Sequence, residues 1–121
     1  MSPLSVLVVD DDEIICTLLE SILTTQGHRV TTRTTPRLGL SAARTQQFDL
    51  VLLDIRMPEL DGVDTLKEMR PLLPGAKFVM ITASAADERV GDALSAGASL
   101  CLSKPFDSEM VGGLLTALFD E

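Results

Sequence analysis

The chain has 121 residues, which at roughly 100 to 200 residues per domain gives room for one domain with one main hydrophobic core. Hydrophobic residues make up 45% of it and charged residues 23%, which excludes a disordered chain and a disulfide-rich miniprotein. Ten Lys and Arg against eighteen Asp and Glu give a formal charge of -8, and a field of this sign repels nucleic acid and anionic membranes.

The sequence predicts a protein that neither enters nor touches a membrane. Its apolar runs are far shorter than the roughly 18 residues that cross a bilayer, and the start Met1-Ser2-Pro3 lacks the basic residues of a secretory signal. We therefore expect a cytoplasmic location. Cys16 and Cys101 stand among apolar neighbours, which predicts buried, reduced thiols and not a disulfide.

The first third of the chain predicts two strand–helix units. The segment Ser5–Val9 is rich in β-branched residues, which favours a strand, and residues 14–23 place apolar side chains at helical spacing. Residues 28–34 predict a second strand. Thr35 and Pro36 then supply an N-cap and a first-turn proline, which predict the start of a second helix.

Strands and helices continue to alternate in the rest of the chain. Several of the predicted strands are apolar on both faces, which is typical of a parallel sheet covered by helices on both sides. We therefore predict an α/β fold with five βα units and a doubly wound, five-stranded parallel sheet. The later strands are predicted at residues 50–53, 77–81 and 100–102, and the later helices at about 62–69, 86–96 and 107–119.

Polar residues follow four of the predicted strands. Asp10 and Asp11 follow the first, Asp54 the third, Thr82 the fourth and Lys104 the fifth. In an open doubly wound sheet, ligands bind beyond the carboxyl ends of the strands, where the strand order reverses. These side chains are therefore predicted to lie at one edge of the sheet and to form the functional site.

Three carboxylates at one edge repel one another unless a cation or raised pKa values compensate. Hard oxygen ligands in this number suit Mg²⁺, which typically combines one or two carboxylates with phosphate oxygens and so implies a phosphorylated substrate. Asp54 stands alone after the central strand and is the better candidate for a nucleophile that forms an acyl phosphate. Asp10 and Asp11 would then hold the metal, and Thr82 and Lys104 would contact phosphoryl oxygens.

Five short motifs together resemble the receiver domain of a two-component response regulator over essentially the whole chain. Each motif is weak by itself, but all five occur in order and each lies at a strand end. They are Leu7-Val8-Val9-Asp10-Asp11 followed by Asp12-Glu13, Leu53-Asp54-Ile55-Arg56-Met57-Pro58 with Asp61-Gly62, Ile81-Thr82-Ala83, Ala96-Gly97-Ala98, and Lys104-Pro105-Phe106.

The resemblance implies a flavodoxin-like fold with strand order 2-1-3-4-5 and a single receiver domain over residues 1–121. It implies that Asp54 accepts a phosphoryl group from the phosphohistidine of a sensor histidine kinase or from a phosphotransfer protein. The domain would catalyse only its own phosphorylation and slow dephosphorylation. It would therefore be a signalling phosphoacceptor and not an enzyme that turns over other substrates.

The resemblance also implies roles for the metal ligands. Asp11 and Asp54 would bind Mg²⁺ directly, Arg56 would add its backbone carbonyl, and Asp10 would act through water. In similar proteins the side chain two residues after the phosphoacceptor controls the access of water to the acyl phosphate. Arg56 occupies this place, and we expect it to slow hydrolysis relative to a small residue.

The phosphoryl oxygens would be bound by Thr82, by Lys104 and by the backbone N–H of Ala83, and the peptide bond between Lys104 and Pro105 would be cis. Phosphorylation in similar proteins draws the hydroxyl at the place of Thr82 inward, and an aromatic residue three positions before the lysine follows it. This chain has Cys101 at that position, so the aromatic half of the coupling is missing.

The expected output is a changed protein surface formed by the fourth helix, the fifth strand and the fifth helix. This face would bind a downstream effector domain or protein, or a second copy of the chain, without direct contact to nucleic acid. Because Cys101 replaces the aromatic residue, either another residue reports the phosphorylation state or the output surface differs. Residues 83–87 are the expected carrier in the second case.

Several of these residues also have ordinary structural interpretations. Asp12 and Glu13 fit an N-cap and an acidic first turn. His28, the single histidine, is expected at the surface without a functional role. Cys101 is expected to pack as a small apolar residue. The pair Gly112-Gly113 suggests close approach of the last helix to the sheet, with a partner helix as the alternative.

Three other functions compete with the receiver interpretation. The Asp-x-Asp in Asp10-Asp11-Asp12 suggests a small phosphatase of the haloacid dehalogenase type, in which Asp10 carries the phosphoryl group. A flavin-binding module is disfavoured because the loop after the first strand is acidic and the chain has no Trp or Tyr. A pseudo-receiver that binds partners without phosphorylation is disfavoured by the complete set of site residues.

Overall fold

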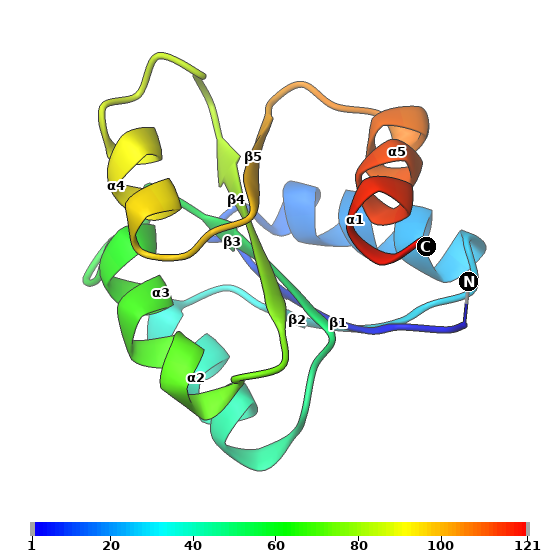
Figure 1. Cartoon of the computed structure of the whole chain (residues 1–121), viewed down its shortest axis with the longest axis horizontal. Coiled ribbons are helices and arrows are strands. Elements are labelled where there is room, and N and C mark those ends of the chain that lie inside the picture. The colour runs from blue at the N-terminus through cyan, green and yellow to red at the C-terminus, as the bar shows by residue number, and fades with distance from the viewer. Residues whose placement is uncertain (1, 121) are drawn as a thin grey trace.

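Strands and helices alternate along the whole chain (Figure 1). The structure is a computed structural model and describes residues 2–120. The elements are β1 (Ser5–Val9), α1 (Glu13–Thr25), β2 (Arg29–Arg33), α2 (Pro36–Thr45), β3 (Leu50–Asp54), α3 (Gly62–Met69), the 3₁₀ turn η1 (Arg70–Leu72), β4 (Lys77–Thr82), α4 (Arg89–Ser95), β5 (Leu100–Ser103) and α5 (Ser108–Phe119).

The five strands form one parallel sheet in the order β2-β1-β3-β4-β5, as predicted. β1 lies between β2 and β3, so that Val8 faces Thr32 on one side and Leu52 on the other. β3 is buried along its whole length. The strand order reverses between β1 and β3, which places the carboxyl ends of these two strands side by side at the switch point of the sheet.

Helices cover both faces of the sheet, with α1 and α5 on one side and α2, α3 and α4 on the other (Figure 1). Successive residues of a strand point to opposite faces, so each central strand contributes to two cores. Every fully buried Val or Leu side chain contributes on the order of 1.5 to 3 kcal/mol to folding. Leu7, Val9, Val51 and Leu53 belong to the core under α2, α3 and α4, whereas Val6, Val8, Leu50 and Leu52 belong to the core under α1 and α5.

Four helices begin at a side chain that accepts a hydrogen bond from a free backbone N–H of the first turn. Asp12 accepts from Ile14, which confirms its predicted capping role. Thr35, Asp61 and Asp107 cap α2, α3 and α5 in the same way. Such a cap contributes about 1 kcal/mol.

α4 has no side-chain cap of this kind at its N-cap residue and begins at Arg89, three residues later than predicted. The preceding segment forms its own local hydrogen bonds. The Ser84 hydroxyl accepts from the N–H of Ala86, and the N–H of Asp87 donates to the Ser84 carbonyl. Because these bonds compete with helical ones, residues 86–88 stay outside the helix.

The surface prediction for His28 is wrong. Its side chain is only 8% exposed, and Nδ1 accepts a hydrogen bond from the N–H of Leu4 at 2.9 Å. The pairing of β1 with β2 brings residue 28 against the residue that precedes β1, although the two lie 24 positions apart. Burial lowers the pKa of His28 below its ordinary value, so the neutral imidazole is the form that accepts this bond.

The expectation for the two cysteines is only partly correct, and that for the two glycines of α5 is wrong. Cys16 is buried as predicted, but Cys101 is only partly buried, and both thiols are free. The expected close approach of Gly112 and Gly113 to the sheet is wrong. A methyl group at Gly112 would meet only the side chain of Gln26, and one at Gly113 would meet nothing within 4 Å.

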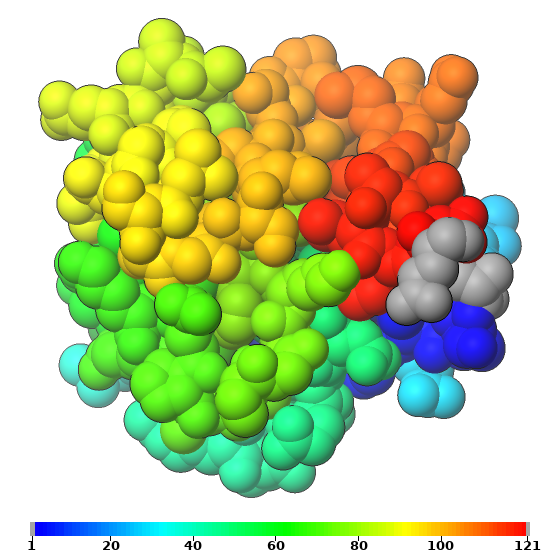
Figure 2. All heavy atoms as spheres, viewed as in Figure 1, coloured from blue at the N-terminus to red at the C-terminus, as the bar shows by residue number. Residues whose placement is uncertain are grey.

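The space-filling view shows one continuous surface that runs from α4 across the β5 region to α5 (Figure 2). Leu94 on α4 and Met110 on α5 are large apolar side chains that remain exposed.

Among residues 2–120, no helix has the length and apolar character needed to cross a membrane.

Gly62 is required for the close approach of α3 to the end of β3. Its N–H donates to the carbonyl of Ile55 at 2.7 Å, and a Cβ on Gly62 would lie 2.0 Å from the carbonyl oxygen of Asp54. We expect Gly62→Ala to lower the free energy of unfolding by more than about 2 kcal/mol because backbone atoms must move apart.

Gly113→Ala is the matched control for this prediction. Its site in α5 is open, so alanine removes only the flexibility of glycine and should raise the free energy of unfolding by about 1 kcal/mol. Urea unfolding of the two variants beside the parent measures both changes. Equal effects of the two substitutions would contradict the role of Gly62 in packing.

His28 predicts a dependence of stability on pH. Because its folded-state pKa lies below 6.5, the unfolded chain takes up a proton that the folded protein refuses, and stability is lost as pH falls below 6.5. The stability difference between the parent and His28→Gln should therefore be larger at pH 7.5 than at pH 5. Urea unfolding across this range tests it, and a pH-independent difference would be the contrary result.

Candidate functional site

Asp10 and Asp11 lie in the turn that connects β1 to α1. The N–H of Asp10 donates to the carbonyl of Arg33, which extends the β1–β2 pairing by one bond past the strand. The Asp10 side chain is fully buried, and its Oδ1 accepts from the N–H of Asp12 at 2.9 Å. Asp11 is exposed. The turn therefore fixes one carboxylate inside the site and leaves the other at its rim.

Asp54 is the last residue of β3, the strand beside β1. Its side chain is 5% exposed, and Oδ1 accepts from the N–H of Arg56 at 3.2 Å. The next residue continues the ladder, because the N–H of Ile55 donates to the carbonyl of Ile81 on β4. The backbone of Asp54 is thus held rigidly while its carboxylate points beyond the sheet edge.

The predicted convergence of Asp10, Asp11 and Asp54 is present in the structure. One carboxylate oxygen of each residue lies within 4.8 Å of those of the other two. Burial, together with the charge of Asp10, raises the pKa of Asp54 to about 8, and the charge of Lys104 acts in the opposite direction. Without a cation, a proton on Asp54 relieves part of the repulsion among these groups.

Lys104 supplies the single positive charge in contact with this carboxylate group in the described part of the chain. Its Nζ lies 3.4 Å from Oδ2 of Asp10, and its backbone N–H donates to the carbonyl of Thr82. The peptide bond between Lys104 and Pro105 is cis. The lysine thus reaches across the switch point from β5 toward the end of β1.

The three carboxylates fit a divalent cation. Oδ2 of Asp10 is buried and has no hydrogen-bond donor among residues 2–120, because the Lys104 contact is an ion pair without hydrogen-bond geometry. An unsatisfied buried carboxylate oxygen costs free energy that a cation would recover. Carboxylate oxygens are the ligands that Mg²⁺ and Ca²⁺ prefer. Asp10, Asp11 and Asp54 are therefore the residues that could hold such an ion.

Thr82 is fully buried at the end of β4, and its hydroxyl makes no hydrogen bond to Asp54. It donates to the carbonyl of Ser84 at 2.8 Å and accepts from the N–H of the same residue. Ala83, between them, is exposed. Cys101 lies opposite Met80 in the β4–β5 pairing and packs against the core under α2, α3 and α4. In this conformation, the cluster formed by Asp10, Asp11 and Asp54 includes neither Thr82 nor Cys101.

Sequence reasoning missed the ion pairs beside the site. The guanidinium of Arg56 donates two hydrogen bonds to Asp87, at 2.9 and 2.8 Å. The guanidinium of Arg89, at the start of α4, donates two hydrogen bonds to Asp61 in the loop before α3, at 3.0 and 3.2 Å. The paired residues lie 31 and 28 positions apart, so no local pattern in the sequence indicates them.

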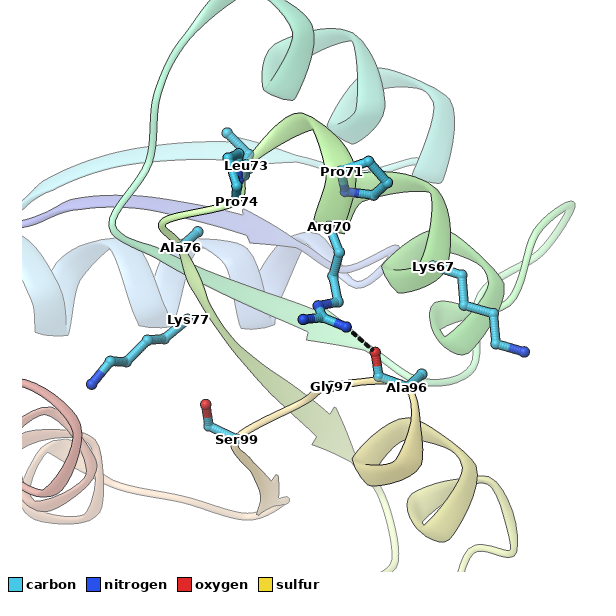
Figure 3. A pocket seen from close by; sticks show the side chains of 10 residues that line it. All are labelled: Lys67, Arg70, Pro71, Leu73, Pro74, Ala76, Lys77, Ala96, Gly97 and Ser99. Carbon is cyan, nitrogen blue, oxygen red and sulfur yellow. Dashed lines mark hydrogen bonds between the residues drawn. The ribbon is translucent and has the colours of Figure 1, made fainter.

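A hollow near the amino-terminal ends of β4 and β5 is lined by basic side chains and lies away from the carboxylates of the site (Figure 3). Arg70 donates from its guanidinium to the carbonyl of Ala96 at the end of α4, and it lies so close to Gly97 that a Cβ there would clash with it. Its charge stabilises the negative end of α4. The side chains of Lys67 and Lys77 point away from the guanidinium of Arg70 in different directions (Figure 3).

Comparison with known proteins agrees with this site. A family profile described as the response regulator receiver domain matches residues 6–115. The transcriptional regulatory protein ZraR of Escherichia coli K12 is 42% identical over 104 residues, which cover 86% of this chain and 24% of ZraR. The chain thus spans about a quarter of the length of this curated relative.

Two solved structures are similar over nearly the whole chain. A response regulator receiver domain protein (CheY-like) of Methanospirillum hungatei JF-1 has a TM-score of 0.90 and 31% identity, covering 96% of this chain and 93% of that one. The receiver domain of the sensor histidine kinase PA1611 of Pseudomonas aeruginosa PAO1 has a TM-score of 0.86 and 29% identity, covering 96% and 97%. Its structure contains a magnesium ion coordinated in the active-site cleft.

The raised pKa of Asp54 predicts a second dependence on pH. Without divalent cations the folded protein keeps a proton between pH 3.8 and about 8 that the unfolded chain releases, so this stability is lost as pH rises through that range. Relative to Asp54→Asn, the parent should lose more than about 1 kcal/mol of unfolding free energy between pH 5 and 8.

Urea unfolding in the presence of EDTA measures this loss, and added Mg²⁺ at pH 8 provides the complementary measurement. The cation should stabilise the parent more than the variant, because the deprotonated carboxylate is one of its ligands. Parallel stability curves for the two proteins would be inconsistent with a shared, repelling carboxylate group.

Proposed function

The chain belongs to the response regulator receiver domain family, and we propose that residues 1–121 form a single receiver domain in which Asp54 is the phosphoacceptor. The observation that carries the assignment is the convergence of three carboxylates and Lys104 at the carboxyl edge of the sheet. Asp54 is the member at the end of the central strand that is both rigidly held and slightly exposed.

In the proposed reaction, a carboxylate oxygen of Asp54 attacks the phosphorus of a phosphohistidine. The new P–O bond forms as the P–N bond breaks, and the imidazole nitrogen keeps the electron pair and takes up a proton. Lys104 neutralises charge on the transferring group. The hydroxyl of Thr82 and the N–H of Ala83 bind the remaining oxygens, which requires Thr82 to leave its present partner Ser84.

Mg²⁺ is the proposed cofactor, and when bound it supplies positive charge that screens the carboxylates from the incoming phosphoryl group. We assign direct coordination to Asp11, Asp54 and the carbonyl of Arg56, with Asp10 acting through water. The unsatisfied Oδ2 of Asp10 and the magnesium ion in the PA1611 receiver domain support this assignment.

The phosphodonor is proposed to be a protein, either a sensor histidine kinase or a phosphotransfer protein. Ile14 and Leu18 on α1 are 77% and 40% exposed and lie close to the acidic turn after β1. Exposed apolar side chains beside a reactive carboxylate suit a protein surface that docks there. This role as a signalling domain in a phosphorelay also implies the cytoplasmic location proposed for the chain.

The output surface is proposed to be the continuous face of α4, β5 and α5 (Figure 2). It would bind an effector domain or protein, or a second copy of the chain. Because Cys101 stands where similar proteins carry an aromatic residue, coupling to this face must use other contacts. Cys101 itself is assigned only a packing role.

The domain is proposed to catalyse no reaction beyond its own phosphorylation and slow dephosphorylation. Two observations disfavour the phosphatase alternative with Asp10 as nucleophile. The side chain of Asp10 is fully buried, whereas that of Asp54 keeps a small exposed fraction of 5%. The side chain of Asp12, the second acid of the Asp-x-Asp pattern, caps α1.

Incubation with acetyl phosphate and Mg²⁺ tests the proposal. Intact mass should show one added phosphoryl group on the parent and none on Asp54→Ala, because the nucleophile is gone. Asp120→Ala, which removes an exposed carboxylate after α5, is the matched control and should be labelled like the parent. EDTA should abolish labelling of the parent.

Other outcomes distinguish the alternatives. Label that persists on Asp54→Ala and vanishes on Asp10→Asn would support the phosphatase interpretation. A parent that stays unlabelled under conditions that label a control receiver domain would indicate a pseudo-receiver.

A further inference from the structure

Residues 21–48 form the longest stretch of the chain without an acidic residue. They contain four arginines, whereas the other residues hold all eighteen Asp and Glu and only six of the ten Lys and Arg. The stretch includes β2, the edge strand opposite β5, and α2, which packs on β1 and β2. One edge of an otherwise acidic protein is therefore basic.

The backbone of β2 has one open side, because β2 pairs only with β1. The N–H of Arg29 donates to the carbonyl of Leu4, and the carbonyl of Arg33 accepts from the first N–H after β1. Alternate residues of a strand in a parallel sheet bond to opposite neighbours. Val30 and Thr32 therefore direct their backbone N–H and C=O groups away from β1, and both residues are partly exposed. Such an edge can accept a further strand.

Arg29 and Arg33 stand beside this open edge without acidic partners. Neither forms an ion pair with a carboxylate among the residues that the structure describes. The guanidinium of Arg33 instead donates to the outward carbonyl of Thr32. Arg33 lies in register with Val9, so both arginines are on the face of the sheet that α2 covers. Four residues of strand separate them by about 13 Å.

We propose that the open edge of β2 is a docking site for an extended acidic segment of a partner protein, which adds to the sheet as a sixth strand. The segment exchanges backbone hydrogen bonds with Val30 and Thr32. Two of its carboxylates pair with Arg29 and Arg33, and the guanidinium of Arg33 leaves the carbonyl of Thr32 to do so. Because strand side chains alternate between faces, these two acids are four residues apart and the residue midway between them lies opposite Thr31.

Charge favours this occupant over a second copy of the chain and over nucleic acid. Two β2 edges that paired with each other would bring the arginines of both copies together, and like charges across strands are unfavourable. Nucleic acid would have to approach a protein with a formal charge of -8. An acidic strand gains both the backbone hydrogen bonds and the attraction to the arginines.

The site is separate from the surfaces assigned to phosphoryl transfer and output. β2 lies at the opposite edge of the sheet from β5, and the site contains none of the residues assigned to metal or phosphoryl binding. On the face of the sheet covered by α1 and α5, Val30 packs against the core and stays partly exposed. An apolar side chain between the two acids of the added strand would contact it there.

Two blocked heptapeptides of equal composition test the geometry. Thr-Glu-Val-Thr-Val-Glu-Thr places both glutamates on one face of a strand, and it reads the same in either direction, so it suits parallel and antiparallel addition. Thr-Glu-Glu-Thr-Val-Val-Thr places them on opposite faces. The first peptide should shift the amide resonances of Val30 and Thr32 and slow their hydrogen exchange, and the second should bind at least about three-fold more weakly.

Variants of the protein test the arginines. Arg29→Gln/Arg33→Gln should weaken binding of the first peptide by about three- to ten-fold, because two exposed ion pairs are lost. Arg37→Gln/Arg44→Gln is the matched control. It removes the same charge from the same acid-free stretch, but Arg37 and Arg44 line a hollow on the α3 side of α2. It should change the affinity by less than about two-fold.

Several outcomes would overturn the inference. Equal binding of the two peptides, equal effects of the two double variants, or unchanged amides at Val30 and Thr32 would mean that charge attraction alone holds the peptide. A short DNA duplex that shifts these amides more strongly than the peptide would identify a nucleic-acid site. Dimers of the parent that the peptide dissociates would identify a self-association edge. All measurements use the unphosphorylated protein, so their outcome does not depend on the proposed phosphoacceptor.

Discussion

Repulsion among the carboxylates at the switch point is the physical constraint that the rest of the structure must offset. Asp10 and Asp54 are both nearly or completely removed from water, and their oxygens lie within 4.8 Å of each other and of Asp11. Burial of like charges at this separation is costly in free energy. Lys104 offsets part of the repulsion. A proton or a cation must offset the rest, which makes the site responsive to both.

The two cores supply the stability that this arrangement requires. Buried aliphatic side chains from both faces of β1 and β3 hold the ends of these strands in place, and the close contact of Gly62 with the backbone of Asp54 fixes the following loop. A rigid sheet edge keeps the carboxylates together even though they repel one another. The electrostatic repulsion is therefore confined to the sheet edge, where a positively charged ligand would relieve it.

The region between β4 and α4 is built differently from the rest. α4 buries only Ala93, and its N-cap residue provides no side-chain cap, whereas the other four helices each have one. The ion pairs Arg56–Asp87 and Arg89–Asp61 and the local hydrogen bonds of residues 84–89 supplement the small apolar contact that α4 makes with the core. Contacts of this kind are individually weak, so this region is held less firmly than the ends of β1 and β3.

The sequence by itself determined the alternation of strands and helices, the parallel sheet and the gathering of Asp10, Asp11, Asp54 and Lys104, because hydrophobic periodicity and strand-end position are local properties. Only the tertiary structure decided that His28 is buried, that Thr82 binds Ser84, and that Arg56 pairs with Asp87. These contacts depend on side-chain direction or join residues far apart in the chain. Residues that are polar and unremarkable in sequence acquire their roles from the neighbours that the fold brings to them.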